Sequence, residues 1–466
     1  RMEAEMVFER REYVLKLYDT ELLHFSAGVS RYGNLYADII EADEGLRKAL
    51  PLPLTANLNS DVLLEWMKSR TIPQNRRFVS EILAQAGLTV GDTLGIIDVC
   101  KGLAVTDAYW IDHVGGNENW ADVNLFDNEL DETLALVAYT GYTSSQHKKL
   151  GLSSEWTTSG QFPKAWRRID GELRLYKGGT EGFANAGMEP YSEYFAHQLA
   201  SAMGVPSVPY DLDRWKGRLA SVCPLLNDRD HALVPFYEAT GQSQFPLNLS
   251  ITEKMGEAAF SDMRSMIVFD ALIYNEDRHA GNYGFLRDNH TGEITGMAPL
   301  YDHNLALFAR DMKSDYAGWA TNAGGKMPRT GLLTFDQQAA MVMGEAQHGQ
   351  LRHLLDFRFE NHPQYPVDQE RLDALNGWIG GRVRDLLSMP VVDEVELRRD
   401  LQHEVAAVKE AIPALGLDKL PAVDVRECVT APEAAGCDLD MEAADARAVS
   451  GDTARGAGLS RDDKTR

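Results

Sequence analysis

The stretch "MRSMIVFDALIYNEDRHAGNYGFLRD" (residues 263–288) constrains the fold of this 466-residue chain more than any other. It begins as a long, mostly apolar helical pattern that runs to Asn275. A helix that is apolar on most sides is buried in a protein core. The polar residues that follow it, from Asp277 to Asn282, are therefore delivered to one place at the edge of that core. Such a fixed polar turn can serve chemistry or can be only a loop, and the neighbouring segments decide between the two.

A hairpin is predicted directly after this turn. Strand-like residues 283–288 and 295–302 flank the turn "NHTG", so the chain should return antiparallel to itself. That return is expected to bring Asp302 close to Asn282 and Asp277. Carboxylate and amide oxygens are hard ligands that suit Mg²⁺, which usually keeps phosphate oxygens as further ligands. A carboxylate that does not bind the metal could orient a nucleophile or accept its proton. This combination of metal ligands and a separate carboxylate is used in phosphoryl transfer by kinases.

This chemistry requires a lysine on a strand and a glutamate on a helix, and both are found upstream. The hairpin "KAWRRIDGELRLYK" (164–177) turns at Asp170-Gly171 and ends at Lys177. A helix predicted over 189–204 carries Glu193 about one turn from its start. Glu189 competes for the lysine, but it precedes Pro190 and is expected to lie before the helix begins.

The segments "NEDRHAGNYGFL", "PLYD" and "RLYKGG…EPYSEYFAHQLASAMGV" resemble the HipA-like serine/threonine kinases over roughly residues 150–390. The order D-R-H-x-x-N is also similar to that of phosphoinositide kinases. The resemblance implies an α+β, two-lobed protein-kinase-like fold with an N-terminal accessory region, and ATP and Mg²⁺ as cofactors. It implies that Asp277 is the catalytic base and that Asn282 and Asp302 hold Mg²⁺. Lys177 would contact phosphate, with Glu193 as its partner.

The same resemblance assigns further residues to the nucleotide. It places Ser159 and Gly160 in a glycine turn near the phosphates, and autophosphorylation near this turn is a property of the family. It also implies a hinge that binds adenine, formed by Pro235, Phe236, Tyr237 and Glu238. The chain departs from the family where Ser192 replaces an asparagine, where no G-x-G-x-x-G loop is present, and where His303 follows Asp302.

The remaining charged residues near these motifs have a structural and a functional interpretation. We expect Arg278 to pair with a carboxylate and His279 to orient the loop, rather than to act in catalysis. Lys164, Arg167 and Arg168 either line the phosphate site or are exposed charges on a strand.

Patterns along the chain predict four regions. Residues 1–145 form an N-terminal accessory α+β region, 146–240 a small lobe, 241–420 a mainly helical large lobe, and 421–466 a disordered tail poor in large apolar residues. The elements expected are strands over 11–41, helical patterns over 59–88, strands from 157 to 177 and around 218–226 and 231–241, and helices near 256–275, 367–389 and 392–412.

Composition limits the partners and the location. The net charge of −24 argues against a broad surface for nucleic acid or anionic membrane. The four cysteines include no C-x-x-C pair, and no apolar run approaches the roughly 18 residues of a membrane span, so the expected location is the cytoplasm. The partners expected are ATP, a protein substrate and, by resemblance, an antitoxin-like protein. A lipid or small-molecule kinase and a non-catalytic ATP-binding or interaction module remain alternatives.

Overall fold

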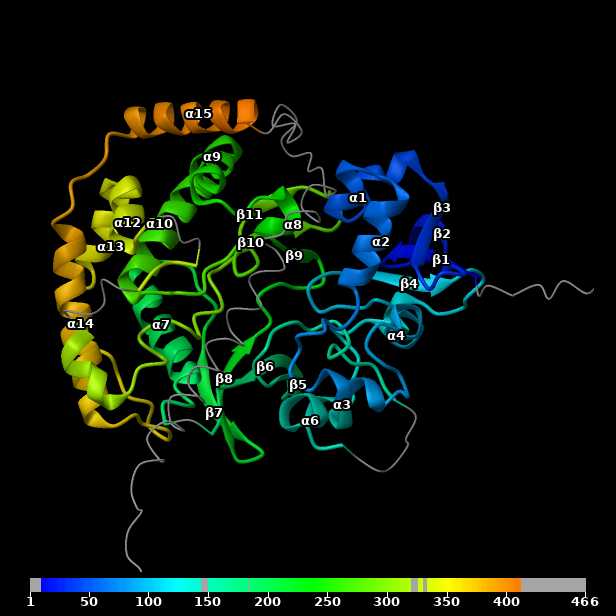
Figure 1. Cartoon of the computed structure of the whole chain (residues 1–466), viewed down its shortest axis with the longest axis horizontal. Coiled ribbons are helices and arrows are strands. Elements are labelled where there is room, and N and C mark those ends of the chain that lie inside the picture. The colour runs from blue at the N-terminus through cyan, green and yellow to red at the C-terminus, as the bar shows by residue number, and fades with distance from the viewer. Residues whose placement is uncertain (1–9, 144–149, 183, 320–325, 330–332, 412–466) are drawn as a thin grey trace, which may run out of the picture. The chain divides into compact units, whose positions relative to one another are not determined.

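The chain folds as an α+β protein, as predicted (Figure 1). The computed structural model describes residues 10–143, 150–182, 184–319, 326–329 and 333–411, and for 404–411 it describes the backbone alone. These residues lie within one unit, Arg1–Asp424. The predicted tail over 421–466 falls outside the described residues. The predicted boundaries near 145 and 240 stay predictions.

The first sheet has the order β3-β2-β1-β4. The strands expected over residues 11–41 are β1 (Arg10–Leu17), β2 (Thr20–Val29) and β3 (Leu35–Ala42), and β4 (Tyr109–His113) joins from later in the chain. Of the predicted helical patterns over 59–88, α2 agrees, whereas α3 is short because Phe78 adopts a left-handed φ of 60° at its start. The helices of this part are η1 (Glu44–Ala49), α1 (Leu52–Ala56), α2 (Ser60–Ser69), α3 (Val79–Ala84), α4 (Thr93–Cys100), α5 (Trp120–Val123) and α6 (Glu132–Thr140).

The second sheet has the order β5-β6-β8-β7 and carries Lys177. Lys164 pairs with Lys177, and Lys177 with Ser221, so these three side chains share one face. The strand predicted to begin at residue 157 is wrong, because residues 157–163 form no strand. The glycine turn predicted at Gly160 agrees with its φ of 106°. The strands are β5 (Lys164–Ile169), β6 (Glu172–Gly178), β7 (Asp211–Trp215) and β8 (Arg218–Pro224).

A third sheet, of order β11-β10-β9, holds the segment after the polar turn. The strand expected from residue 231 is β9 (His231–Pro235), but it pairs with β10 (Gly284–Asp288) and not with the lysine-bearing sheet. Gly284 is required at this crossing, because a Cβ there would lie 2.2 Å from the carbonyl oxygen of Val234. The predicted hairpin is present as β10 and β11 (Ile294–Met297), but the return strand ends at Met297 and does not reach residue 302 as predicted.

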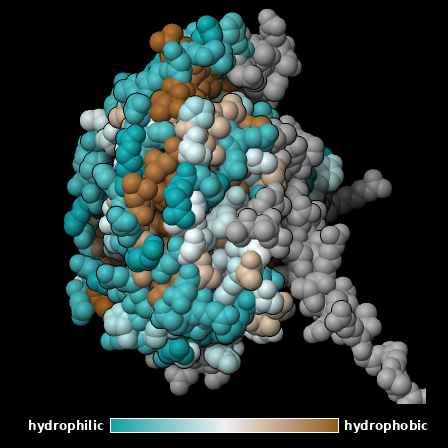
Figure 2. Space-filling view, turned by 90° about the vertical axis from the view of Figure 1, so that its left-hand side faces the viewer, coloured by the Kyte–Doolittle hydropathy of each residue, from teal (hydrophilic) through white to brown (hydrophobic). Residues whose placement is uncertain are grey.

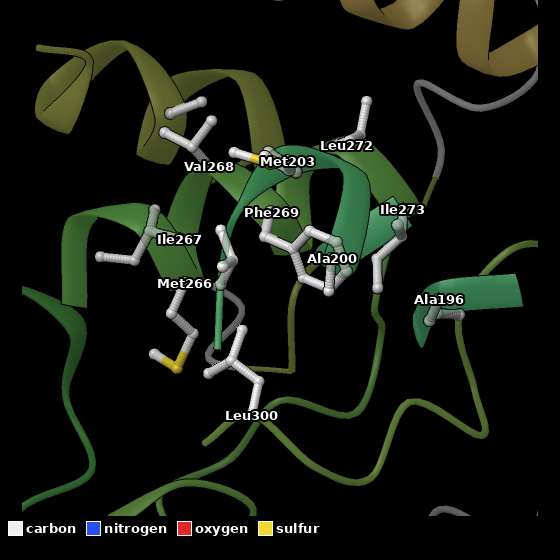
Figure 3. Packing of buried hydrophobic residues seen from close by; sticks show 14 of the residues in the cluster. Ala196, Ala200, Met203, Met266, Ile267, Val268, Phe269, Leu272, Ile273 and Leu300 are labelled. Carbon is white, nitrogen blue, oxygen red and sulfur yellow. The ribbon is translucent and has the colours of Figure 1, made fainter. Parts of the chain in front are cut away.

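The central helix of the remaining structure is α10 (Glu257–Ile273), the apolar helix predicted from the sequence. Its buried residues belong to one cluster with those of α7 (Glu189–Met203), and Figure 3 shows Phe269 and Leu272 of α10 with Ala200 and Met203 of α7. The helices predicted near 367–389 and 392–412 are confirmed as α14 (Gln369–Leu387) and α15 (Glu394–Ala411). The other elements are α8 (Phe236–Thr240), α9 (Phe245–Met255), η2 (Lys313–Gly318), α12 (Phe335–Val342), α13 (Glu345–Arg352), α14 (Gln369–Leu387) and α15 (Glu394–Ala411).

Hydrophilic side chains predominate on the face shown in Figure 2, with hydrophobic side chains in smaller groups between them. Among the described residues, none of the helices has the length and apolar character needed to cross a membrane.

A buried arginine joins the N-terminal part of the chain to β10. Arg287 donates to the carbonyl oxygens of Lys48 (2.6 Å) and Leu50 (2.9 Å), to the hydroxyl of Tyr109 (2.9 Å) and to the carbonyl oxygen of Gly292 (2.9 Å). Because β10 begins two residues after Asn282, this contact links the N-terminal sheet region to the polar turn.

We expect Arg287→Ala to lower the free energy of unfolding by about 3 kcal/mol, because several buried acceptors lose their donor. Urea denaturation followed by circular dichroism measures the change. Arg352→Ala, at an exposed position in α13, is the control and should change it by less than about 0.5 kcal/mol. An Arg287→Ala protein as stable as this control would contradict the role given to Arg287.

Candidate active site

The end of α10 positions the polar turn through a buried ion pair. Arg278 donates to both carboxylate oxygens of Asp270, at 2.9 and 3.1 Å. It also donates to the carbonyl oxygens of Asn282 (2.6 Å) and Tyr301 (2.7 Å). The expectation that Arg278 pairs with a carboxylate and shapes the loop is confirmed by these contacts.

Arg278 links the backbone of Asn282 to that of Tyr301, the neighbour of Asp302, which agrees with the predicted approach of the two segments. The amide nitrogen of Asn282 donates to the carbonyl oxygen of Asp277 (3.1 Å), which turns the amide oxygen away from that carbonyl. Asp302 has a left-handed φ of 57°, and its backbone N–H donates to the hydroxyl of Tyr210 (3.1 Å). A non-glycine residue in that conformation is held there by its surroundings, and such residues are concentrated at functional sites.

Lys177 stands at the centre of a buried charge cluster. Its ammonium group pairs with Glu193 and, at 2.7 Å, with Asp302. The second carboxylate oxygen of Glu193 accepts from the hydroxyl of Ser221 (2.7 Å). The partner of Lys177 is therefore Glu193 and not Glu189. Glu189 is the first residue of α7, so the expectation that it precedes the helix is wrong. Its carboxylate accepts the backbone N–H of Thr180 at 3.2 Å.

The charges of this cluster stabilise each other. Burial alone would raise the pKa of Asp302, but Lys177 and Lys164 outweigh it and hold that pKa well below its usual range. Burial alone would lower the pKa of Lys177, but Asp302 and Glu193 outweigh it and raise that pKa. Both groups are therefore charged at neutral pH, as an ammonium that contacts phosphate and a carboxylate that binds a metal must be.

Lys164 is a second buried lysine near Lys177. The sequence alone did not decide whether Lys164 lies in the site or is an exposed charge. A Cβ at Gly160 would lie 2.1 Å from the ammonium nitrogen of Lys164, so the glycine turn leaves room for this side chain. Burial, together with the charge of Lys177, lowers the pKa of Lys164 to about 7. The strand register could have identified Lys164, because it pairs directly with Lys177. Arg167 lies over the rings of Tyr176 and Trp215 instead.

Arg168 and Ser192 have structural contacts. Arg168 donates to the carbonyl oxygens of Leu125, Phe126 and Asn128, and therefore does not line the phosphate site. Ser192, where the family has asparagine, donates to the carbonyl oxygens of His303 (2.5 Å) and Ala306 (2.8 Å). The hydroxyl thus ties α7 to the segment that follows Asp302.

Asp277, the predicted base, forms an ion pair with Arg329, from a distant segment of the chain. Sequence reasoning did not identify Arg329, because no motif marks it. His279 accepts the backbone N–H of Gly281 (3.1 Å), and burial lowers its pKa, so it is neutral at pH 7. Its predicted role in orienting the loop agrees with this contact.

The predicted hinge residues Pro235, Phe236, Tyr237 and Glu238 are not brought to the cluster around Lys177. They lie at the end of β9 and in α8. The backbone N–H groups of Phe236 and Tyr237 already donate to the carbonyl oxygens of Tyr283 and Ala280, each at 2.9 Å. Proline has no N–H to offer. This segment therefore supports the polar turn, and its arrangement does not favour adenine binding.

Asn282 and Asp302 offer a metal an amide oxygen and a carboxylate. Among the described residues, there is no group of three or more His, Cys, Asp or Glu side chains arranged as a metal site. Two protein oxygens completed by phosphate and water suit Mg²⁺ better than Zn²⁺, which takes three or four nitrogen or sulfur ligands. The oxygen donors of Asn282 and Asp302 are therefore chemically suited to Mg²⁺.

Comparisons with known proteins point to kinases. No protein-family model matches the chain. Serine/threonine-protein kinase CtkA of Helicobacter pylori is 27% identical over 135 residues, which cover 25% of this chain and 40% of CtkA. The chain thus spans about two fifths of the length of this curated relative. The resemblance to serine/threonine kinases inferred from the motifs is supported by this similarity.

Two solved structures are also similar. The crystal structure of the Helicobacter pylori proinflammatory kinase CtkA has a TM-score of 0.38 at 15% identity, over 53% of this chain and 94% of that chain. HipA of Shewanella oneidensis, in a toxin–antitoxin complex with HipB and operator DNA, has a TM-score of 0.47 at 12% identity, over 81% of this chain and 100% of that chain. At these scores the similarity carries no detail of the site.

We expect Lys164→Met to stabilise the protein at pH 6 and to do so less at pH 9. The folded state releases the Lys164 proton near pH 7, whereas the unfolded state keeps it to about pH 10.5. The wild type therefore gains stability between these values, because its unfolded state binds more protons. Urea denaturation at both pH values measures the difference from wild type, with Lys254→Met at an exposed position as the control. A destabilised Lys164→Met protein at pH 6 would contradict this expectation.

Proposed function

We propose that this protein is an ATP- and Mg²⁺-dependent phosphotransferase that acts on a serine or threonine hydroxyl of a protein. The observation that carries the proposal is the buried cluster of Lys177, Glu193 and Asp302 beside the loop of Asp277 and Asn282. A strand lysine held by a helical glutamate, next to one acidic and one amide oxygen for metal, matches the parts that kinases use. Similarity to a serine/threonine kinase supports the same class.

In this proposal each residue has one role. Lys177 and Lys164 would neutralise phosphate oxygens. Asn282 and Asp302 would hold Mg²⁺, which would supply positive charge beside the phosphates. The carboxylate of Asp277 accepts a hydrogen bond from the acceptor hydroxyl and orients it toward the phosphorus. Most of the rate enhancement would come from positioning and charge, because Arg278 and Glu193 fix these groups before the substrate arrives.

We place the adenine near the end of β8 rather than at Pro235–Glu238. Leu175 lies two residues before Lys177 on the same face of β6, and its partner in the register is Cys223 of β8. Leu175, Leu226 and Tyr301 are partly buried around Cys223 and form an apolar surface beside the charge cluster. A planar base fits such a surface while its phosphates reach the two lysines.

The acceptor and the partners are assigned by similarity alone. The family resemblance suggests self-phosphorylation near Ser159, toxin-like activity and an antitoxin-like partner. A lipid or small-molecule kinase would use the same Asp277 and Asn282. A non-catalytic ATP-binding module would keep the lysine cluster without transfer.

We expect Asp277→Ala to abolish phosphate transfer and to leave Mg·ATP binding largely intact, because Asp277 faces the acceptor and not the nucleotide. Asp302→Ala should instead weaken Mg·ATP binding at least about tenfold, since a metal ligand is lost. The measurements are transfer from γ-labelled ATP, to the protein itself and to proteins in a cell lysate, and calorimetric titration with Mg·ATP.

Three results would contradict the proposal in different ways. Transfer that survives in Asp277→Ala refutes the base. Labelling of a lipid or metabolite fraction, with no protein labelled, favours the small-molecule alternative. A melting temperature that Mg·ATP does not raise refutes the nucleotide site.

A further inference from the structure

The segment that leads to the turn around Gly160 is held by side chains and backbone of the N-terminal part of the chain. Trp156, just before the turn, is buried in one hydrophobic cluster with residues of α3, α4 and α6. The hydroxyl of Thr157 donates to the carbonyl oxygen of Leu103 at 2.9 Å. The region predicted to be accessory therefore fixes the approach to this turn.

Arg76 and Glu155 form a buried ion pair along the edge of β5. A guanidinium nitrogen of Arg76 lies 2.8 Å from a carboxylate oxygen of Glu155. Within the described residues β5 is an edge strand, so no other strand pairs with its outward backbone groups. Arg76 donates to the carbonyl oxygen of Lys164 (2.8 Å), and the other carboxylate oxygen of Glu155 accepts the backbone N–H of Trp166 (2.8 Å). The ion pair thus takes the place of a neighbouring strand.

These contacts fix the strand at the residue that faces the site. Arg76 also donates to the carbonyl oxygen of Phe162 (3.4 Å), so it holds the backbone on both sides of residue 163. Successive side chains of a strand point to opposite faces, and a slip of one residue would turn Lys164 away from Lys177. The fixed register keeps the two lysines on one face.

We propose that the buried pair of Arg76 and Glu155 positions Lys164 for phosphate, so that the N-terminal part of the chain is a component of the nucleotide site. The role rests on the phosphotransferase function proposed above. Arg76 touches no phosphate in this role and is a positioning residue. A binding group that has lost its supporting contacts must be ordered by the ligand, which costs affinity. The loss should fall on the phosphates and not on adenosine, because the apolar surface around Cys223 is separate from the edge of β5.

The test replaces the pair in Arg76→Met/Glu155→Leu, which removes both charges and keeps the core filled. A single substitution to an apolar residue would leave a buried charge without its partner. The matched control is Lys16→Met/Asp112→Leu, which removes a buried ion pair (3.0 Å) between β1 and β4 of the N-terminal sheet. The melting temperature of each full-length variant reports whether it is folded.

Calorimetric titration with adenosine, Mg·ADP and Mg·ATP measures the affinity that the phosphates add. In Arg76→Met/Glu155→Leu, the Kd for Mg·ATP should rise about tenfold, while the Kd for adenosine changes less than about twofold. A general loss of structure would weaken the binding of all three ligands. The control should bind all three as wild type does.

Two further variants show whether the pair acts through Lys164. In a Lys164→Met background, replacing the pair should raise the Kd for Mg·ATP less than about twofold, because the lysine that it positions is gone. Arg76→Lys keeps a charge beside Glu155 without the planar fork, so it should raise this Kd about threefold. Arg76→Lys takes the place of the double variant if that protein does not fold.

Other outcomes overturn the role. An unchanged Kd for Mg·ATP in the folded double variant would show that the pair positions nothing that the nucleotide uses. Equal losses for adenosine and Mg·ATP would make the pair a general support of the fold, and a tenfold loss that persists in the Lys164→Met background would exclude Lys164 as its target. A wild type that binds Mg·ATP but transfers no labelled phosphate would refute the proposed function, whereas the Kd values would still decide the role of the pair.

Discussion

The buried pair of Arg278 and Asp270 is the interaction on which the candidate active site depends. Asp270 lies within the apolar helix α10, so a carboxylate in the core needs a permanent counter-charge. Arg278 supplies it and, with the same guanidinium, fixes the backbone of Asn282 and Tyr301. Removing either partner would leave an unpaired buried charge. This one ion pair therefore neutralises a charge in the core and fixes the shape of the polar turn.

What the sequence could predict follows from how local each signal is. The apolar pattern of α10, the turn at Asp170-Gly171 and the "NHTG" hairpin are local, and each predicted element is present. Pairing between distant strands is not local. The strand β9 has the same alternation whether it extends the lysine-bearing sheet or pairs with β10. Periodicity therefore could not decide which sheet β9 joins.

The site residues also divide into those that a local sequence pattern marks and those that only distant contacts identify. Lys177, Glu193 and Asp302 were predicted because their element types and order form a pattern, and the structure brings them into contact. Lys164 stood in the sequence as one of several strand charges, and only its register against Lys177 distinguishes it. Arg329 lies 52 residues from Asp277 in sequence and belongs to no motif. A contact of that kind depends on the packing of the whole helical part, which no local pattern encodes.

A net charge of −24 is unfavourable for the proposed binding of the anion ATP, but the charged groups near Asp302 include three cationic side chains. Lys177 and Lys164 are paired in the strand register, and Arg278 is a third positive charge near Asp302. These three charges lower the pKa of Asp302, although burial alone would raise it. A carboxylate kept ionised among these cations is prepared to receive a metal ion. In the proposed function, Asp302 would hold Mg²⁺, and Lys177 would then keep Glu193 as its partner and have a donor for phosphate.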